Sequence, residues 1–270
     1  MLKTGTRIAL LLVTSFGCGM GLCQVKPEEV TFDSGKLQLH GFLWKPSGDG
    51  PFPGILWNHG SEKFPGSQPS LATFYTSHSY VFFIPHRRGQ GRSPGTYIQN
   101  LVDQAPSSVR GRRLIELLDE QVTDVAAALT FLRSKTFVDS SRIALSGCSY
   151  GGIETLLAGE HDLGVKALIP FAPGAMSWER NPELSIRLSR AIELATAPVF
   201  LLQAENDYSL GPSHILSSEG TRKYKDFRSK IYSAFGNSPQ DGHWGFCSSA
   251  TDLWGSDVLA FLDEVMKVRQ

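Results

Sequence analysis

The segment Gly147-Cys148-Ser149-Tyr150-Gly151-Gly152 constrains the fold of this chain more than any other feature. Residues 142–146 before it form a short apolar run typical of a buried strand, and residues 153–159 after it are typical of a helix. The segment therefore places G-x-S-x-G between a strand and a helix, a corner so tight that the positions two before and two after the serine must lack side chains. A solvated serine in a glycine-rich turn is the alternative interpretation. The strand-turn-helix context favours Ser149 as an exposed nucleophile.

Short apolar runs and amphipathic segments alternate along the rest of the chain. Residues 30–32 and 37–44 are separated by Asp33-Ser34-Gly35 and predict an antiparallel hairpin, and residues 116–134 predict an amphipathic helix. The other predicted strands are 55–58, 81–85, 142–146, 165–169, 199–203 and 230–233, and the other predicted helices are 71–77, 153–159 and 251–268. This order predicts an α/β fold with a mostly parallel central sheet, an antiparallel N-terminal hairpin and helices on both faces.

Composition narrows the classes of partner. Lysine and arginine total 26, and so do aspartate and glutamate, so the chain has no basic field and we predict no nucleic-acid partner. Neither Cys-x-x-Cys nor His-Glu-x-x-His occurs, so we predict no metal and no cofactor. No repeat or linker divides the chain, and residues 24–270 are therefore predicted to form one catalytic domain. The sequence predicts no particular oligomeric state.

The first 23 residues have the layout of a secretory signal peptide. Lys3 and Arg7 accompany a polar start, residues 8–13 are apolar, and small residues follow up to Cys23. The apolar run is far shorter than the roughly 20 residues needed to cross a bilayer, and no later segment is long enough, so we predict no integral membrane span. We expect a secreted or periplasmic protein, with a lipid anchor at Cys18 as the alternative.

Two cysteines, Cys148 and Cys247, remain after removal of residues 1–23. An oxidising compartment permits one bridge between them. Sequence alone does not place their Cα atoms within bridging distance. We favour two unpaired, half-buried thiols and keep the disulfide as the alternative.

A serine hydroxyl needs a base to become a good nucleophile, and the base needs an acid to orient it. His243 lies in a glycine-flanked loop between the last predicted strand and the last helix, and we predict that it is the base. Asp207 follows the strand at 199–203 and is the predicted acid, with Glu205 and Asp241 as the alternatives. The resulting order of nucleophile, acid and base is the one that open α/β sheets use.

The second element of such a site is a pair of amides that stabilise a developing oxyanion. The segment Asn58-His59-Gly60-Ser61-Glu62 follows an early predicted strand, and its glycine allows the backbone to approach the serine corner. We predict the amides of Tyr150 and Ser61 as the two donors, with Glu62 as an alternative to Ser61. His59 is expected to hold the loop by hydrogen bonds. Four other histidines are expected to be structural or solvated: His40, His78, His161 and His214.

Together these segments resemble the α/β-hydrolase superfamily, and within it the dienelactone hydrolase and prolyl-oligopeptidase-like branch. The matching segments span most of residues 24–270: Asn58-His59-Gly60, Arg87-Arg88-Gly89-Gln90-Gly91-Arg92-Ser93, Gly147-Cys148-Ser149-Tyr150-Gly151-Gly152, Asn206-Asp207 and Gly242-His243. There are two departures. Dienelactone hydrolases proper have a cysteine where this chain has Ser149, and 270 residues leave no room for the propeller domain of prolyl oligopeptidases.

The resemblance implies a Ser-His-Asp hydrolase that acts through an acyl-enzyme, with a small-molecule carboxylic ester as substrate. An ester is expected because an alkoxide leaves more readily than an amine. A small peptidase or acyl-aminoacyl hydrolase is the alternative, followed by a non-catalytic binding protein on the same fold. We expect the segment 174–196 to form a small lid that carries Trp178. The predicted pocket residues are Glu62, Phe64, Trp178 and Trp244, with Tyr150 and Phe246 nearby, and each aromatic ring has core packing as its alternative.

Overall fold

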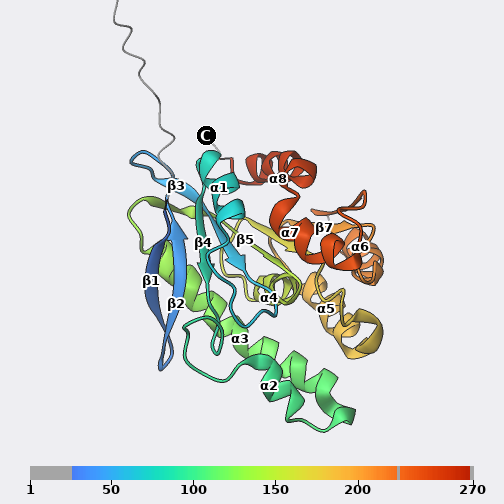
Figure 1. Ribbon diagram of the computed structural model, residues 1–270. Coiled ribbons are helices and arrows are strands. Elements are labelled where there is room, and N and C mark those ends of the chain that lie inside the picture. The colour runs from blue at the N-terminus through green and yellow to red at the C-terminus, as the bar shows by residue number, and fades with distance from the viewer. Residues whose placement is uncertain (1–25, 224–225, 268–270) are drawn as a thin grey trace, which may run out of the picture.

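An eight-stranded sheet forms the centre of the protein (Figure 1). The computed structural model describes residues 26–223 and 226–267. The strand order is β1-β2-β4-β3-β5-β6-β7-β8, in which β2 pairs antiparallel with β1 and β4 and every other neighbouring pair is parallel. The strands are β1 (Glu28–Ser34), β2 (Leu37–Trp44), β3 (Phe52–Asn58), β4 (Val81–Pro85), β5 (Val138–Cys148), β6 (Ala167–Phe171), β7 (Val199–Ala204) and β8 (Phe227–Tyr232). The predicted fold class is therefore confirmed.

Helices cover both faces of this sheet. Successive side chains of a strand point to opposite faces, and in β3 the side chains of Ile55 and Trp57 pack in one core cluster while Leu56 packs in the other. The first cluster contains residues of α1 (Pro69–Ser77), α7 (Phe246–Ser249) and α8 (Thr251–Val265). The second contains residues of α2 (Ile98–Asp103), α3 (Arg110–Arg133), α4 (Tyr150–Gly159), α5 (Pro182–Leu194) and α6 (Gly211–Lys223). The described residues also include three short helical turns: η1 (Ser107–Val109), η2 (Trp178–Arg180) and the π-helical η3 (Asp241–Gly245).

The prediction of a lid at 174–196 is wrong. Most of this segment is helix α5, whose Leu184, Leu188 and Ile192 are fully buried in the core and which packs against α4 and α6. These apolar residues recur four positions apart, which is the spacing of one helical face. The segment covers the sheet as the other helices do.

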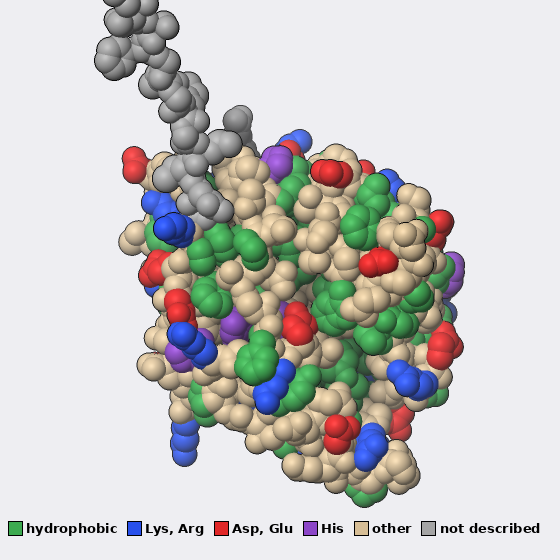
Figure 2. Space-filling model, viewed as in Figure 1, with side chains coloured by type: hydrophobic (Ala, Val, Ile, Leu, Met, Phe, Trp, Pro, Cys, Tyr) green, Lys and Arg blue, Asp and Glu red, His purple; other side chains and the backbone are tan. Residues whose placement is uncertain are grey.

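The surface carries both signs of charge. Figure 2 shows lysine and arginine side chains interspersed with aspartate and glutamate across the visible face. Of the helices in the described part of the chain, none has both the length and the apolar character that a membrane span requires.

Candidate active site

Ser149 lies at the corner between β5 and α4, with φ 57° and ψ −117°. A positive φ is uncommon for a residue with a side chain and marks a strained backbone. The corner leaves no space on either side: a Cβ at Gly147 would lie 2.5 Å from the carbonyl oxygen of Asn58, and one at Gly151 would lie 1.8 Å from the same oxygen. This confirms the steric requirement for glycine. Ser149 therefore sits at the N-terminus of α4, where backbone amides lack partners within the helix and favour negative charge.

His243 lies in the π-helical turn η3 and is paired with Asp207. Its Nδ1 is 2.8 Å from Oδ1 of Asp207, and neither side chain is exposed. A carboxylate accepts hydrogen bonds, so Nδ1 donates and a neutral ring keeps a lone pair on Nε2. Nε2 is buried and has no hydrogen-bond partner within residues 26–223 and 226–267. The rings of Tyr208 and Trp244 pack edge-on against the imidazole at centroid distances of 5.6 and 5.3 Å.

A disulfide between Cys148 and Cys247 joins residues 235–247, the histidine segment, to the serine corner between β5 and α4. The prediction of two unpaired thiols is therefore wrong: the two Cα atoms are 6.0 Å apart although 99 residues separate them in sequence. The sulfur of Cys148 also lies 4.0 Å from the carbonyl oxygen of His243. These contacts bring His243 next to the residue that directly precedes Ser149.

Both oxygens of the Asp207 carboxylate are held in place. Oδ1 also accepts a hydrogen bond from the backbone N–H of Tyr208 at 2.6 Å, and Oδ2 accepts one from Nε2 of Gln203 at 2.8 Å. Gln203 is fixed in turn by Ser213, whose hydroxyl donates to its Oε1 at 2.7 Å. Sequence reasoning missed Gln203, although a single amide in the otherwise apolar strand β7 was a usable signal.

The two alternative acids lie elsewhere. Oδ2 of Asp241 accepts hydrogen bonds from Ser238 and from the backbone of Asn237, and these hydrogen bonds lower the pKa of Asp241. Glu205 is exposed. The structure thus brings Asp207, of the three candidates, to the ring of His243.

Three side-chain donors converge on the carbonyl oxygen of Gly60. Nη2 of Arg87 and Nδ1 of His59 donate to it at 2.9 Å, and Nε2 of Gln90 donates at 3.3 Å. The backbone N–H of Arg87 donates to Nε2 of His59 at 3.2 Å, which leaves the ring proton on Nδ1 and confirms that His59 holds the loop. In a trans peptide the C=O and the next N–H point in opposite directions. The N–H of Ser61 therefore points away from the side chains that hold Gly60.

Comparison with known proteins identifies the family of this chain. The acetyl xylan esterase (AXE1) family profile matches residues 18–194, which is more than half of the chain. The chain belongs to the acetyl xylan esterase (AXE1) family. This AXE1 family member is therefore a hydrolase, and it lies in the dienelactone hydrolase and prolyl-oligopeptidase-like branch of the α/β-hydrolase superfamily.

Individual relatives of this AXE1 family member are distant. The quorum-quenching protein AidA of Acinetobacter baumannii is 25% identical over 170 residues, which are 60% of this chain and 50% of AidA. The chain thus spans about half the length of that curated relative.

Solved structures share the fold. An esterase of Pyrococcus furiosus matches with a TM-score of 0.64 and 14% identity, covering 90% of this chain and 92% of the esterase. An acylaminoacyl peptidase of Pyrococcus horikoshii matches with a TM-score of 0.69 and 18% identity, covering 93% of this chain and 43% of the peptidase.

In this protein a cavity of about 520 Å³ lies beside the loop that follows Gly60. It brings together the predicted residues Ser61, Glu62, Phe64 and Trp244. The indole of Trp244 covers Gly60, where an added Cβ would lie 1.9 Å from the ring. Burial raises the pKa of Glu62. The other lining residues are Pro65, Gln68, Tyr97, Gln240 and Ser248.

Two of the predicted aromatic residues belong to the core instead. Trp178 is 5% exposed and packs against Gly211, outside the cavity that Trp244 lines. The prediction that Trp178 lines a substrate pocket depended on the lid at 174–196; Trp178 lies instead in the buried turn η2, directly ahead of the core helix α5. Phe246 is fully buried and packs against Tyr232.

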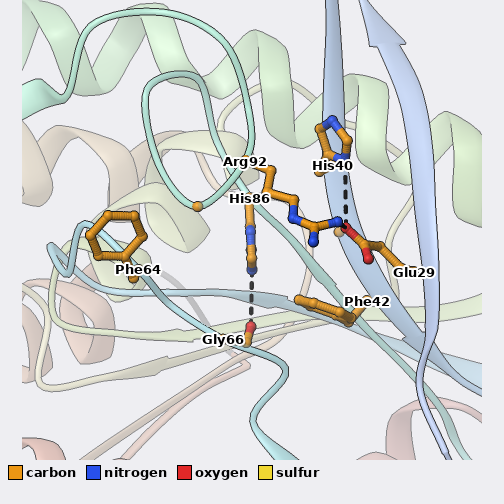
Figure 3. Close-up of a pocket in the computed structure, with 9 residues that line it drawn as sticks. Glu29, His40, Phe42, Phe64, Gly66, His86 and Arg92 are labelled. Carbon is orange, nitrogen blue, oxygen red and sulfur yellow. Dashed lines mark hydrogen bonds and ion pairs between the residues drawn. The ribbon is translucent and has the colours of Figure 1, made fainter.

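A second cavity, of about 340 Å³, lies between β2 and the segment from Phe64 to Gly66 (Figure 3). The ring of Phe42 packs edge-on against His86, whose Nε2 donates to the carbonyl oxygen of Gly66 at 2.9 Å. Arg92 forms an ion pair with Glu29 in the same lining. Phe64 is 74% exposed and lines both cavities.

A buried carboxyl group lies on α4, the helix that starts after Ser149. Glu154 is fully buried, neither of its oxygens has a hydrogen-bond partner in the described part of the chain, and burial raises its pKa to about 8 although the charge of Arg87 opposes the shift. Well below pH 4.5 the group is protonated in both the folded and the unfolded state, and its titration does not change the stability. As the pH rises toward 8, the unfolded chain releases this proton while the folded protein keeps it, so stability is lost.

We therefore expect Glu154→Gln to lose less stability than the wild type between pH 5 and pH 8. From pH 5 to pH 8 the unfolding free energy of the wild type should fall by on the order of 3–5 kcal/mol more than that of Glu154→Gln, as measured by urea denaturation at the two pH values. Glu205→Gln makes the same chemical change at an exposed position and should track the wild type. Parallel losses in the Glu154→Gln variant and the wild type would contradict the assignment of a protonated Glu154.

Proposed function

We propose that this protein is a secreted serine hydrolase that cleaves small-molecule carboxylic esters, with Ser149, His243 and Asp207 as its catalytic triad. The observation that carries the proposal is the 2.8 Å hydrogen bond between Nδ1 of His243 and Asp207, which leaves Nε2 of the ring without a partner among the described residues. The Cys148–Cys247 disulfide links the segment that carries this ring to the residue before Ser149. A hydroxyl, an imidazole and a carboxylate in this order form the arrangement that activates a serine.

In this mechanism Nε2 of His243 takes the hydroxyl proton of Ser149 as its oxygen attacks the ester carbonyl carbon. Asp207 holds the ring and stabilises the imidazolium that forms. The oxyanion accepts hydrogen bonds from the backbone amides of Tyr150 and Ser61. The imidazolium then protonates the departing alkoxide and leaves an acyl-enzyme. Water, deprotonated by the same imidazole, attacks the acyl group. The imidazolium then protonates Oγ of Ser149 as it leaves, which releases the acid and restores the free serine and the neutral histidine.

The choice of Ser61 over Glu62 as the second donor is supported by the Gly60 peptide. The inward carbonyl of Gly60 is held by Arg87, His59 and Gln90, and this holds the N–H of Ser61 in the opposite direction before any substrate binds. A donor oriented in advance needs no reorganisation when the oxyanion forms.

Export is part of the same proposal. The predicted signal peptide, residues 1–23, lies outside the described residues, and so does Cys18 of the alternative lipid anchor. The Cys148–Cys247 disulfide supports export, because such bonds persist in oxidising compartments and are rare in the cytosol.

The test compares p-nitrophenyl esters of increasing acyl length with aminoacyl p-nitroanilides. We expect kcat/KM to be higher for the esters, because an amine is a poorer leaving group, and we expect a fluorophosphonate probe to label the wild type but not Ser149→Ala. A preference for anilides would favour the peptidase alternative. Equal labelling of wild type and Ser149→Ala would contradict the proposed nucleophile.

A further inference from the structure

The Cys148–Cys247 disulfide connects the two segments that carry the proposed nucleophile and base. Cys148 is the last residue of β5 and directly precedes Ser149, while Cys247 lies in α7, four residues after His243. Both cysteines are buried, at 3% and 1% exposure. The bond therefore constrains how far the imidazole lies from the serine corner.

Other contacts hold the histidine segment to a different part of the fold. The side chain of Asn206, in the loop after β7, donates to the carbonyl oxygen of Phe235 at 2.9 Å and accepts from the N–H of Phe235 at 3.0 Å. Nε1 of Trp254 in α8 donates to the carbonyl oxygen of Phe246 at 2.9 Å. These hydrogen bonds tie the segment to the β7 loop and to α8, whereas the disulfide ties it to the serine corner.

Both cysteines belong to a core cluster that is rich in aromatic rings. The ring of Phe246 packs between Phe171 and Tyr232 at centroid distances of 6.2 and 5.5 Å, and Phe171 also packs against Trp254 at 4.9 Å. These buried contacts do not depend on the sulfur atoms. The segment should therefore stay folded against the core when the disulfide is opened, with more freedom at its approach to the corner.

We propose that Cys148 and Cys247 are positioning residues of the active site, whose disulfide sets the approach of Nε2 of His243 to the Ser149 hydroxyl and makes turnover depend on its oxidation state. The inference rests on the proposed triad. Proton transfer needs hydrogen-bond distance, and a displacement of about 1 Å can cost about 100-fold in rate. Opening the bond consumes a dithiol: the disulfide takes up two electrons and two protons and becomes two thiols, and the dithiol is oxidised to its own disulfide.

The experiment compares three forms of the full chain: oxidised wild type, wild type reduced with dithiothreitol, and the double variant Cys148→Ala with Cys247→Ala. Mass spectrometry after alkylation counts the thiols in each form. We expect the reduced form and the double variant to show kcat for p-nitrophenyl acetate lowered by about 10- to 100-fold, with KM changed much less. Fluorophosphonate labelling of Ser149 should slow in parallel, and far-ultraviolet circular dichroism should be unchanged. Oxidised glutathione should restore the reduced wild type, and dithiothreitol should leave the double variant as it is.

The outcomes separate this inference from the proposed function. If reduced wild type keeps its kcat and shows only a lower melting temperature, the bond stabilises the fold and does not position the base, so the inference fails alone. Loss of the folded circular dichroism signal at the assay temperature also overturns it, because the bond would then be required for folding. Oxidised wild type that neither turns over esters nor labels at Ser149 overturns the proposed function and the inference with it.

Discussion

Ser149→Ala is expected to lower kcat for p-nitrophenyl esters by about four to six orders of magnitude, because the variant lacks the hydroxyl that forms the acyl-enzyme in the proposed mechanism. His243→Ala should cost a similar factor, since the hydroxyl then has no base to take its proton. In the proposed triad the two residues act as one unit, so the double variant should be little worse than either single one. Circular dichroism of each variant checks that the fold is kept.

Matched substitutions show whether the losses are specific. Ser146→Ala removes a hydroxyl three residues earlier on the same strand, one that donates to the carbonyl oxygen of Ile169 at 2.9 Å. His161→Ala removes an exposed imidazole in the turn that follows α4. Both variants should keep turnover close to that of the wild type. Substantial turnover in Ser149→Ala, or a loss as large in Ser146→Ala, would contradict the assignment.

Local geometry explains why the serine corner and the mostly parallel sheet with its antiparallel hairpin were predictable from sequence. A strand, a tight turn and a helix within a dozen residues leave few backbone solutions, and the glycines at 147 and 151 meet the resulting steric limits. His243 and Asp207 were predictable because they follow the last two parallel strands, whose carboxyl ends lie at the same edge of the sheet as Ser149. In each case the sequence position alone limits where the side chain can be.

Contacts between distant segments were not predictable in this way. The disulfide depends on how η3 and α7 return to the end of β5, and nothing in the spacing of two cysteines 99 residues apart encodes that return. The hold of Arg87 and Gln90 on Gly60 depends on the pairing of β3 with β4. Helix α5 was missed because its apolar face lies within a stretch that is otherwise polar. Trp178 lies in η2, directly ahead of α5, and its burial depends on the packing of distant segments that its position in the sequence does not encode.

Asp207→Asn is expected to lower kcat by about 10³- to 10⁴-fold, and the hydrogen bonds around the carboxylate explain why an isosteric amide cannot replace it. Three groups donate to this carboxylate: Nδ1 of His243, Nε2 of Gln203 and the N–H of Tyr208. An asparagine has one acceptor oxygen and one donor nitrogen. If its NH₂ faces Gln203, two donors oppose each other.

If the NH₂ of the asparagine faces His243, it opposes the N–H of Tyr208 instead, so neither orientation of the amide satisfies all three donors. We expect the second orientation, which is the one that gives the wrong tautomer of the histidine in Ser-His-Asp triads. Nδ1 must then accept, the ring proton moves to Nε2, and the imidazole can no longer take the proton of Ser149. Two further variants test this argument: Glu205→Gln and Asp241→Asn remove the competing carboxylates and should keep most of the activity, since neither touches the ring. Activity that survives Asp207→Asn but disappears in Glu205→Gln would show that Asp207 is not the acid and would give that role to Glu205. A crystal structure of Asp207→Asn with the side-chain oxygen facing Nδ1 would keep the acid and reject the tautomer explanation.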